Sequence, residues 1–243
     1  MFSEAQYQAV IDELNSGMAQ LSGHLGRINP TIQAATNHWY IPDWVADALV
    51  ACGNKLMEAG RWIVEKIGEL LEGAAAPVLF FWKAYDWHSG VGGPASQVAG
   101  NTSAGALRAT FDWSGDAATA YTRAVSTQPT AAAEIQAIST TMATSLGICA
   151  AAGLAFYVAL GIILVKVIAA TIAAIAAFGS VVFSPAGVAI IIEEAAVSGA
   201  MIWAAIGSLT ALLAAQANQI VAMKGAASAG DAFPRGAWPV GTV

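Results

Sequence analysis

The chain has 243 residues, of which 57% are apolar and only 11% are charged, and its formal net charge is −6. Soluble domains usually carry roughly 25% charged residues, so this composition indicates contact with an apolar environment. An acidic chain with few lysines and arginines lacks the basic surface that binds phosphate backbones, which excludes nucleic acid as a partner.

The first part of the chain, residues 1–86, predicts an amphipathic helical hairpin. Ser3 followed by Gln6 is typical of a capping box that opens a helix, and apolar residues then recur every three or four positions. Pro30 is expected to end this helix. A second amphipathic helix is predicted from about residue 43 to residue 71, and a short aromatic helical turn follows it.

Residues 87–144 predict a second helix–turn–helix. Their first stretch, HSGVGGPASQ, is rich in glycine and is expected to be a linker. A helix is predicted from about residue 94 to residue 110, and Trp113-Ser114-Gly115 separates it from the next helical stretch. Pro129 is expected to kink or restart that stretch.

The motif at this turn resembles the WXG100 proteins of actinobacterial type VII (ESX) secretion, over about residues 87–145. The resemblance is carried by Trp113-x-Gly115 between helices and by the Asp-Ala-Ala-x-x-Tyr121 that follows. It implies a small helical hairpin that pairs with a WXG100-type partner and serves as an export substrate or chaperone of the type VII machinery. Trp113, Gly115 and Tyr121 would then form the turn and export motif.

The export pattern of that family, Tyr-x-x-x-Asp/Glu, is absent, because Val125 stands four residues after Tyr121. Export would therefore depend on a partner protein that carries the signal. The alternative interpretation is a plain helix–turn–helix corner. In such a corner Gly115 permits a tight reversal, and the Trp113 ring packs over the end of the bundle.

Residues 145–223 predict a long apolar helical hairpin, with a bend at Pro185 and Gly187. The only charged residues in this stretch are Lys166, Glu193 and Glu194. Each arm exceeds the roughly 20 residues that cross about 30 Å of hydrocarbon, so the arms would tilt in a bilayer or extend beyond it. Residues 224–243 are expected to form an irregular tail.

Charged and polar groups inside an apolar hairpin are costly in lipid. We expect Lys166 to reach toward the two glutamates or to pair between subunits. Polar residues on the second arm share one helical face, which is interpreted either as a helix–helix seam, the favoured reading, or as a water-lined pore face. The polar residues of the hairpin are Lys166, Glu193, Glu194, Ser198, Ser208, Gln216 and Gln219.

The sequence therefore predicts an all-α protein of long helical hairpins that ends in a membrane-type hairpin. The histidines lack metal-ligand spacing and no catalytic motif occurs, so no enzyme activity, metal or cofactor is expected. Cys52 and Cys149 are expected to be free thiols rather than a disulfide. The N-terminus has no basic region followed by an apolar run, so no Sec-type signal peptide is expected.

The leading hypothesis is a type VII secretion-associated protein that inserts into membrane lipid and forms a homo-oligomer, with a pore as the assembled form. It would reside in the membrane or cell envelope, or be secreted without a Sec signal. One alternative is an integral-membrane scaffold or secretion accessory factor that opens no pore. The other is a soluble self-assembling structural protein that buries its apolar arms between subunits.

Overall fold

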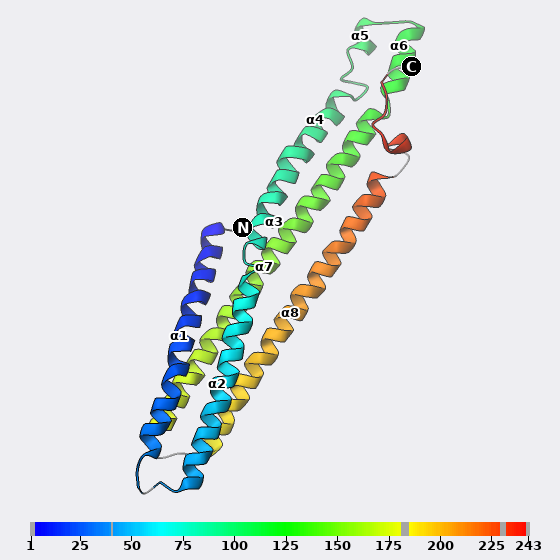
Figure 1. The fold of residues 1–243 in the computed structure, drawn as a ribbon. Coiled ribbons are helices and arrows are strands. Elements are labelled where there is room, and N and C mark those ends of the chain that lie inside the picture. Colours follow the sequence, from blue (N-terminus) through cyan, green and yellow to red (C-terminus); the bar gives the residue numbers. More distant parts are fainter. Residues whose placement is uncertain (1–2, 40, 181–184, 229–231, 242–243) are drawn as a thin grey trace. The chain divides into compact units, whose positions relative to one another are not determined.

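The computed structural model describes residues 3–39, 41–180, 185–228 and 232–241. No strand occurs within these ranges, and the all-α prediction is confirmed (Figure 1). In chain order the elements are α1 (Glu4–Thr36), α2 (Asp43–Leu71), α3 (Ala76–Tyr85), the π-helical segment η1 (Asp86–Gly92), α4 (Gly93–Asn101), α5 (Ala109–Asp112), α6 (Asp116–Val125), α7 (Gln128–Gly179), α8 (Pro185–Ala227) and the 3₁₀ turn η2 (Pro234–Gly236).

The chain divides into two compact units. Unit 1 comprises Met1–Ala76 and Ala152–Thr210, and unit 2 comprises Pro77–Ala151 and Ala211–Val243. Helices α7 and α8 each contribute residues to both units. The expected start of the apolar hairpin at Ser145 therefore lies inside the continuous helix α7.

Helices α1 and α2 form the predicted antiparallel hairpin in unit 1. The side chain of Ser3 caps α1 by accepting a hydrogen bond from the backbone N–H of Gln6, as the capping box predicted. Each helix buries one stripe of apolar residues at alternating three- and four-residue steps, the spacing that packs side chains between the ridges of a neighbouring helix. The buried stripe includes Leu14, Leu21, Leu25, Ile28 and Ile32 of α1 and Leu49, Leu56, Ile63 and Ile67 of α2.

Glycines allow α1 and α2 to approach closely. A Cβ atom at Gly60 would lie 2.5 Å from Cδ2 of Leu25, which is too close for two carbon atoms, and Gly53 is similarly crowded by Ile32. We expect Gly60→Leu to lower the free energy of unfolding by about 1–3 kcal/mol, because the core cannot absorb the added side chain without strain.

Gly23 supplies the matched control for this prediction, because a Cβ atom there would meet no atom within 4 Å. Gly23→Leu should leave stability unchanged or raise it by up to about 1 kcal/mol, since leucine favours the helical conformation more than glycine does. Chemical denaturation followed by circular dichroism measures both variants. Equal midpoints for the two variants would contradict the close packing of α1 on α2.

The expected end of α1 at Pro30 is wrong, because the helix continues to Thr36 with the proline inside it. Proline removes the backbone hydrogen bond to the carbonyl of Gly26, whereas the hydroxyl of Thr31 donates to the neighbouring carbonyl of Arg27 at 2.8 Å. The turns beyond the proline also bury Ile32, which extends the packing with α2. Tertiary packing here outweighs the local signal.

The expected linker after residue 87 is also wrong, because the chain remains helical through η1 and α4 in unit 2. The π-helical turn widens the helix, and the hydroxyl of Ser139 on α7 donates to the carbonyl of Trp87. Gly92 lies directly against Ser139, where a Cβ atom would come within 3.0 Å of the hydroxyl oxygen. The glycines therefore allow close contact with α7 rather than a break.

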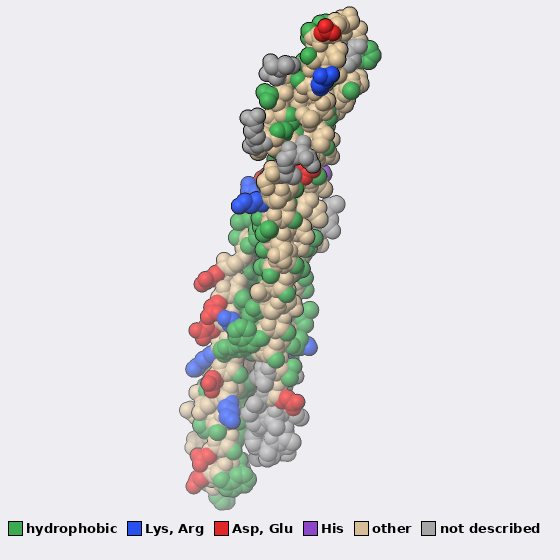
Figure 2. All heavy atoms as spheres, turned by 90° about the vertical axis from the view of Figure 1, so that its right-hand side faces the viewer, with side chains coloured by type: hydrophobic (Ala, Val, Ile, Leu, Met, Phe, Trp, Pro, Cys, Tyr) green, Lys and Arg blue, Asp and Glu red, His purple; other side chains and the backbone are tan. Residues whose placement is uncertain are grey.

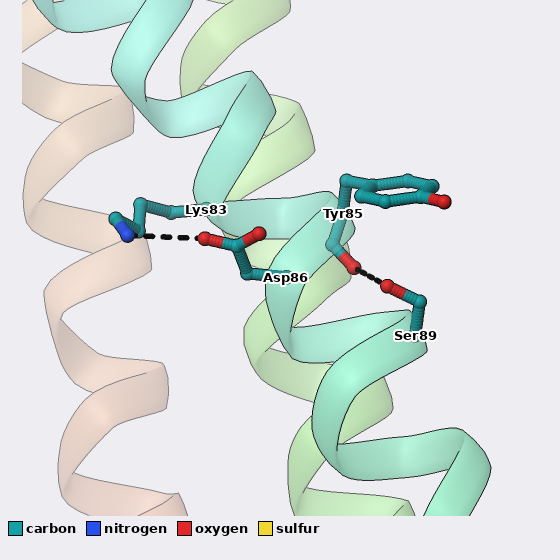
Figure 3. Close-up of polar contacts among 4 residues, drawn as sticks. All are labelled: Lys83, Tyr85, Asp86 and Ser89. Atoms are coloured by element: carbon teal, nitrogen blue, oxygen red, sulfur yellow. Dashed lines mark hydrogen bonds and ion pairs between the residues drawn. The ribbon is translucent and has the colours of Figure 1, made fainter.

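Two local polar contacts lie at the start of this π-helical segment (Figure 3). The ammonium group of Lys83 lies 3.0 Å from the carboxylate of Asp86, and the hydroxyl of Ser89 donates to the carbonyl of Tyr85 at 2.8 Å. Both contacts join residues on the same helical turn, and the ion pair is solvent-exposed, so they contribute little to stability.

The helix expected over residues 94–110 ends earlier, at Asn101. The hydroxyls of Thr102 and Ser103 donate to the carbonyls of Val98 and Gly100, which favours an end to the helix at this point. Pro129 restarts the chain as a helix, as expected, since α6 ends at Val125 and α7 begins at Gln128. The tail is less irregular than expected, because α8 extends to Ala227 and a 3₁₀ turn follows.

Candidate membrane-binding site

Helix α7 has two different apolar faces within unit 1. The covered face is buried against neighbouring helices, and Gly17 of α1 packs on it so closely that a Cβ atom there would lie 2.7 Å from Cδ2 of Leu164. The residues of this covered face follow one another along α7 at steps of three and four, the spacing found in coiled-coil seams. The covered face consists of Tyr157, Leu160, Leu164, Val167, Thr171, Ala174 and Phe178.

The second face of α7 is apolar and open to solvent. It consists of Val158, Ile162, Val165 and Ile172, and we call it the open face. Ile162 and Val165 are 54% and 57% exposed. A shallow hollow of 300 Å³ runs along part of it, with Val10 and Glu13 of α1 on the other wall. Large branched side chains are seldom left in water as a continuous helical stripe, so the open face marks a candidate contact surface.

Helix α8 is even less buried. Among the residues that the structure describes, two stretches are long and apolar enough to cross a membrane, Asp116–Gly179 and Val197–Ala227, and only 33% and 11% of their most apolar windows are buried. Figure 2 views the side on which α8 lies, and most charged side chains of the lower part gather at one edge of that view. The rest of the coloured surface of that part shows few charged side chains.

Two tyrosines join the α1–α2 hairpin to α7 in unit 1. The Tyr7 hydroxyl donates to the carbonyl of Ala74 at 2.6 Å, and the Tyr157 hydroxyl donates to the carbonyl of Leu70 at 2.8 Å. The carbonyl of Leu70 lies in the last turn of α2, where it also accepts from the backbone N–H of Gly73, and Ala74 lies just beyond the end of that helix. The two rings meet edge to face with centroids 5.8 Å apart. We call this arrangement the tyrosine clamp.

The tyrosine clamp predicts a specific pH dependence of stability. Burial, and then the neighbouring Tyr157, raise the pKa of Tyr7 well above its ordinary value near 10. The stabilisation from neutral Tyr7 is therefore complete below about pH 10 and is lost as the pH rises further. Tyr7→Phe should be about 1 kcal/mol less stable than wild type at pH 8, with the difference closing between pH 10 and 12.

Denaturant titrations at several pH values measure this difference. Tyr85→Phe is the matched control, because the side chain of Tyr85 is largely exposed. Loss of its hydroxyl should leave the free energy of unfolding unchanged at every pH tested. A gap between wild type and Tyr7→Phe that stays constant up to pH 12 would contradict the proposed role of the clamp.

The charged residues of the apolar hairpin lie in different surroundings. Lys166 is exposed beside the open face. It lines the same shallow hollow as Glu13 of α1. Glu193 is exposed on α8. The expected bend at Pro185 and Gly187 is wrong, because both residues lie in the first turn of α8. The side chain of Glu194 and residues 181–184 lie outside the part that the structure describes, so the expected pairing of Lys166 with Glu194 stays a prediction.

The polar stripe of α8 does not share one environment. Within unit 1, Ser198 is fully buried and Ser208 is exposed, and no partner for the Ser198 hydroxyl is found among the described atoms. Within unit 2, Gln216 is half-buried and Gln219 is exposed. The buried serine fits the seam interpretation, whereas the exposed members remain open to either interpretation.

The Trp113–Gly115 corner of unit 2 has the geometry of a tight reversal. Gly115 is the N-cap residue of α6 and has a φ of 101°, a backbone conformation that residues other than glycine rarely adopt. The ring of Trp113 is half-exposed and packs on Tyr121 with ring centroids 6.0 Å apart. These residues are thus brought together, although the helix before them, α5, has only four residues.

The sequence alone does not predict the tyrosine clamp, because its two tyrosines, Tyr7 and Tyr157, are far apart in the chain and belong to no recognised motif. The signal available was a tyrosine at a core position, since a buried hydroxyl needs a hydrogen-bond partner. Cys52 and Cys149 are free thiols, as expected, and burial raises the pKa of Cys52. Within the described ranges no three His, Cys, Asp or Glu residues are grouped so that they could hold a metal ion.

Comparison of the chain with protein-family models, with curated proteins and with solved structures finds no match.

Proposed function

We propose that this chain is a type VII secretion-associated protein that inserts its α7–α8 hairpin into a membrane and oligomerises there, with a pore as the assembled form. The single observation that carries membrane insertion is the uncovered apolar surface of these two helices. Only 11% of the most apolar window of α8 is buried, although that window could cross a bilayer.

The α1–α2 hairpin serves as a soluble shield in this proposal. It packs on the covered face of α7 through Gly17 and the tyrosine clamp, and its outer surface carries most of the charges of unit 1. Removal of the shield would expose the covered face, so that α7 could be surrounded by lipid or by other copies of the chain. The association with type VII secretion rests on the resemblance of the Trp113–Gly115 corner to WXG100 proteins.

One observation favours a second candidate, a soluble assembly that buries its apolar helices between subunits. Lys166 lies beside the open face, and a lysine facing hydrocarbon costs about 2.5–3.5 kcal/mol near the bilayer centre. Contact with a carboxylate of another subunit would offset this cost. Glu193 is exposed and could supply such a carboxylate.

Size measurement of the purified chain, with and without detergent, combined with dye release from vesicles, separates these functions. A pore-forming protein should release dye and form oligomers in detergent. A membrane scaffold should bind vesicles without releasing dye. A soluble assembly should form large oligomers without detergent and leave vesicles intact, and that result would refute membrane insertion.

A further inference from the structure

Two tryptophans stand out at the connector between α1 and α2. Trp39 is 97% exposed and Trp44, in the first turn of α2, is 71% exposed. Neither ring contributes to the core of unit 1, although indole rings are normally among the most useful packing groups. Rings of this type concentrate where hydrocarbon meets lipid headgroups, because the ring is apolar and its N–H can still be hydrated.

The described residues of the connector, 37–39 and 41–42, lie beside the end of α7. The backbone N–H of Ile41 donates to the carbonyl of His38, and that of Val45 donates to the carbonyl of Pro42. Both His38 and Ile41 line a cavity of 410 Å³ together with Phe178 and Ser180 at the end of α7. The two tryptophans are therefore held at the same end of unit 1 as the point where α7 ends.

This end of unit 1 carries no basic residue from either chain segment. Residues 28–54 contain no lysine or arginine and two acids, Asp43 and Asp47, while residues 167–192 contain no charged residue at all. Attraction to anionic lipid needs lysine or arginine near the surface. The composition instead fits an uncharged, zwitterionic headgroup layer, into which aromatic rings partition without electrostatic help.

We propose that the connector, through Trp39 and Trp44, is the bilayer-docking surface of the protein and that it enters the headgroup layer first. The adjoining end of α7 is thereby brought to the hydrocarbon, and the uncharged stretch 167–192 follows it. Docking does not require anionic lipid. This inference rests on the proposed membrane insertion and adds the entry point and the lipid class.

Binding to phosphatidylcholine vesicles, with and without phosphatidylglycerol, tests the proposal. The full chain should bind both kinds of vesicle within about twofold. Trp39→Ser/Trp44→Ser should lower the partition coefficient on the order of 100-fold, which is about tenfold for each buried ring. Trp39→Phe/Trp44→Phe should retain most of the binding, because the rings remain. Circular dichroism verifies that each variant is folded.

Phe111 is the matched control, because it is 77% exposed but lies in unit 2. Phe111→Ser should bind within about twofold of wild type. If wild type binds vesicles and the double serine variant binds equally well, the docking surface is refuted while membrane insertion stands. A requirement for phosphatidylglycerol also refutes it. If wild type binds neither kind of vesicle, the proposed function itself fails.

Discussion

Locking α1 to α7 with a disulfide should abolish membrane insertion. In a background of Cys52→Ala and Cys149→Ala, the pair Gly17→Cys and Leu164→Cys places two thiols at the closest contact of these helices, since a Cβ atom at position 17 would lie 3.3 Å from Cγ of Leu164. The oxidised protein cannot expose the covered face of α7. We expect its dye release from vesicles to fall at least tenfold and to recover after reduction.

A second disulfide provides the matched control. The pair Ile32→Cys and Gly53→Cys joins α1 to α2 within the hairpin and leaves the contact with α7 free to open. Its oxidised and reduced forms should insert equally well. Full insertion of the oxidised protein with the disulfide between positions 17 and 164 would show that α1 does not shield α7. That result would contradict the proposed shielding role of the α1–α2 hairpin.

Charges on the open face of α7 should block insertion without harming the fold. Val165 and Ile172 are 57% and 47% exposed, so Val165→Glu/Ile172→Glu should change the free energy of unfolding by less than about 1 kcal/mol. In hydrocarbon each carboxylate costs about 2.5–3.5 kcal/mol, roughly a 100-fold loss in partitioning. Vesicle flotation measures this loss.

Asn15→Glu/Gln20→Glu adds the same charge to an exposed surface of α1 and serves as the control. It should float as wild type does, because α1 is expected to remain in water. If the open-face variant also floats as wild type does, the open face does not contact lipid. A protein partner would then be the better explanation of its exposure.

The sequence predicted the helical class and several elements because their signals are local. The apolar stripe of α2 and its flanking residues located the helix at Asp43–Leu71, and Pro129 correctly marked the restart of the chain at α7. The predictions of a helix end at Pro30 and of a linker near residue 90 are wrong for a common reason. The local sequence does not show whether tertiary packing outweighs a lost hydrogen bond, or whether a neighbouring helix needs a glycine at a close contact.

The candidate site could be located but not resolved from sequence. Helix α7 is apolar around most of its circumference, so periodicity does not distinguish the covered face, with Leu160 and Leu164, from the open face, with Ile162 and Val165. Only the positions of the helices that pack on α7, α1 and α2 among them, make that distinction. The tyrosine clamp likewise depends on the carbonyl of Leu70, which is distant from Tyr157 in the sequence.

Flotation of the purified, detergent-free chain with phosphatidylcholine vesicles, followed by an alkaline carbonate wash and protease treatment, tests membrane insertion most directly. Insertion predicts that the chain rises with the vesicles, resists the wash and retains a protected fragment with roughly 20 residues from each of the helices Gln128–Gly179 and Pro185–Ala227, the length that a bilayer covers. Recovery of the chain at the bottom of the gradient as a large, protease-sensitive assembly would contradict membrane insertion.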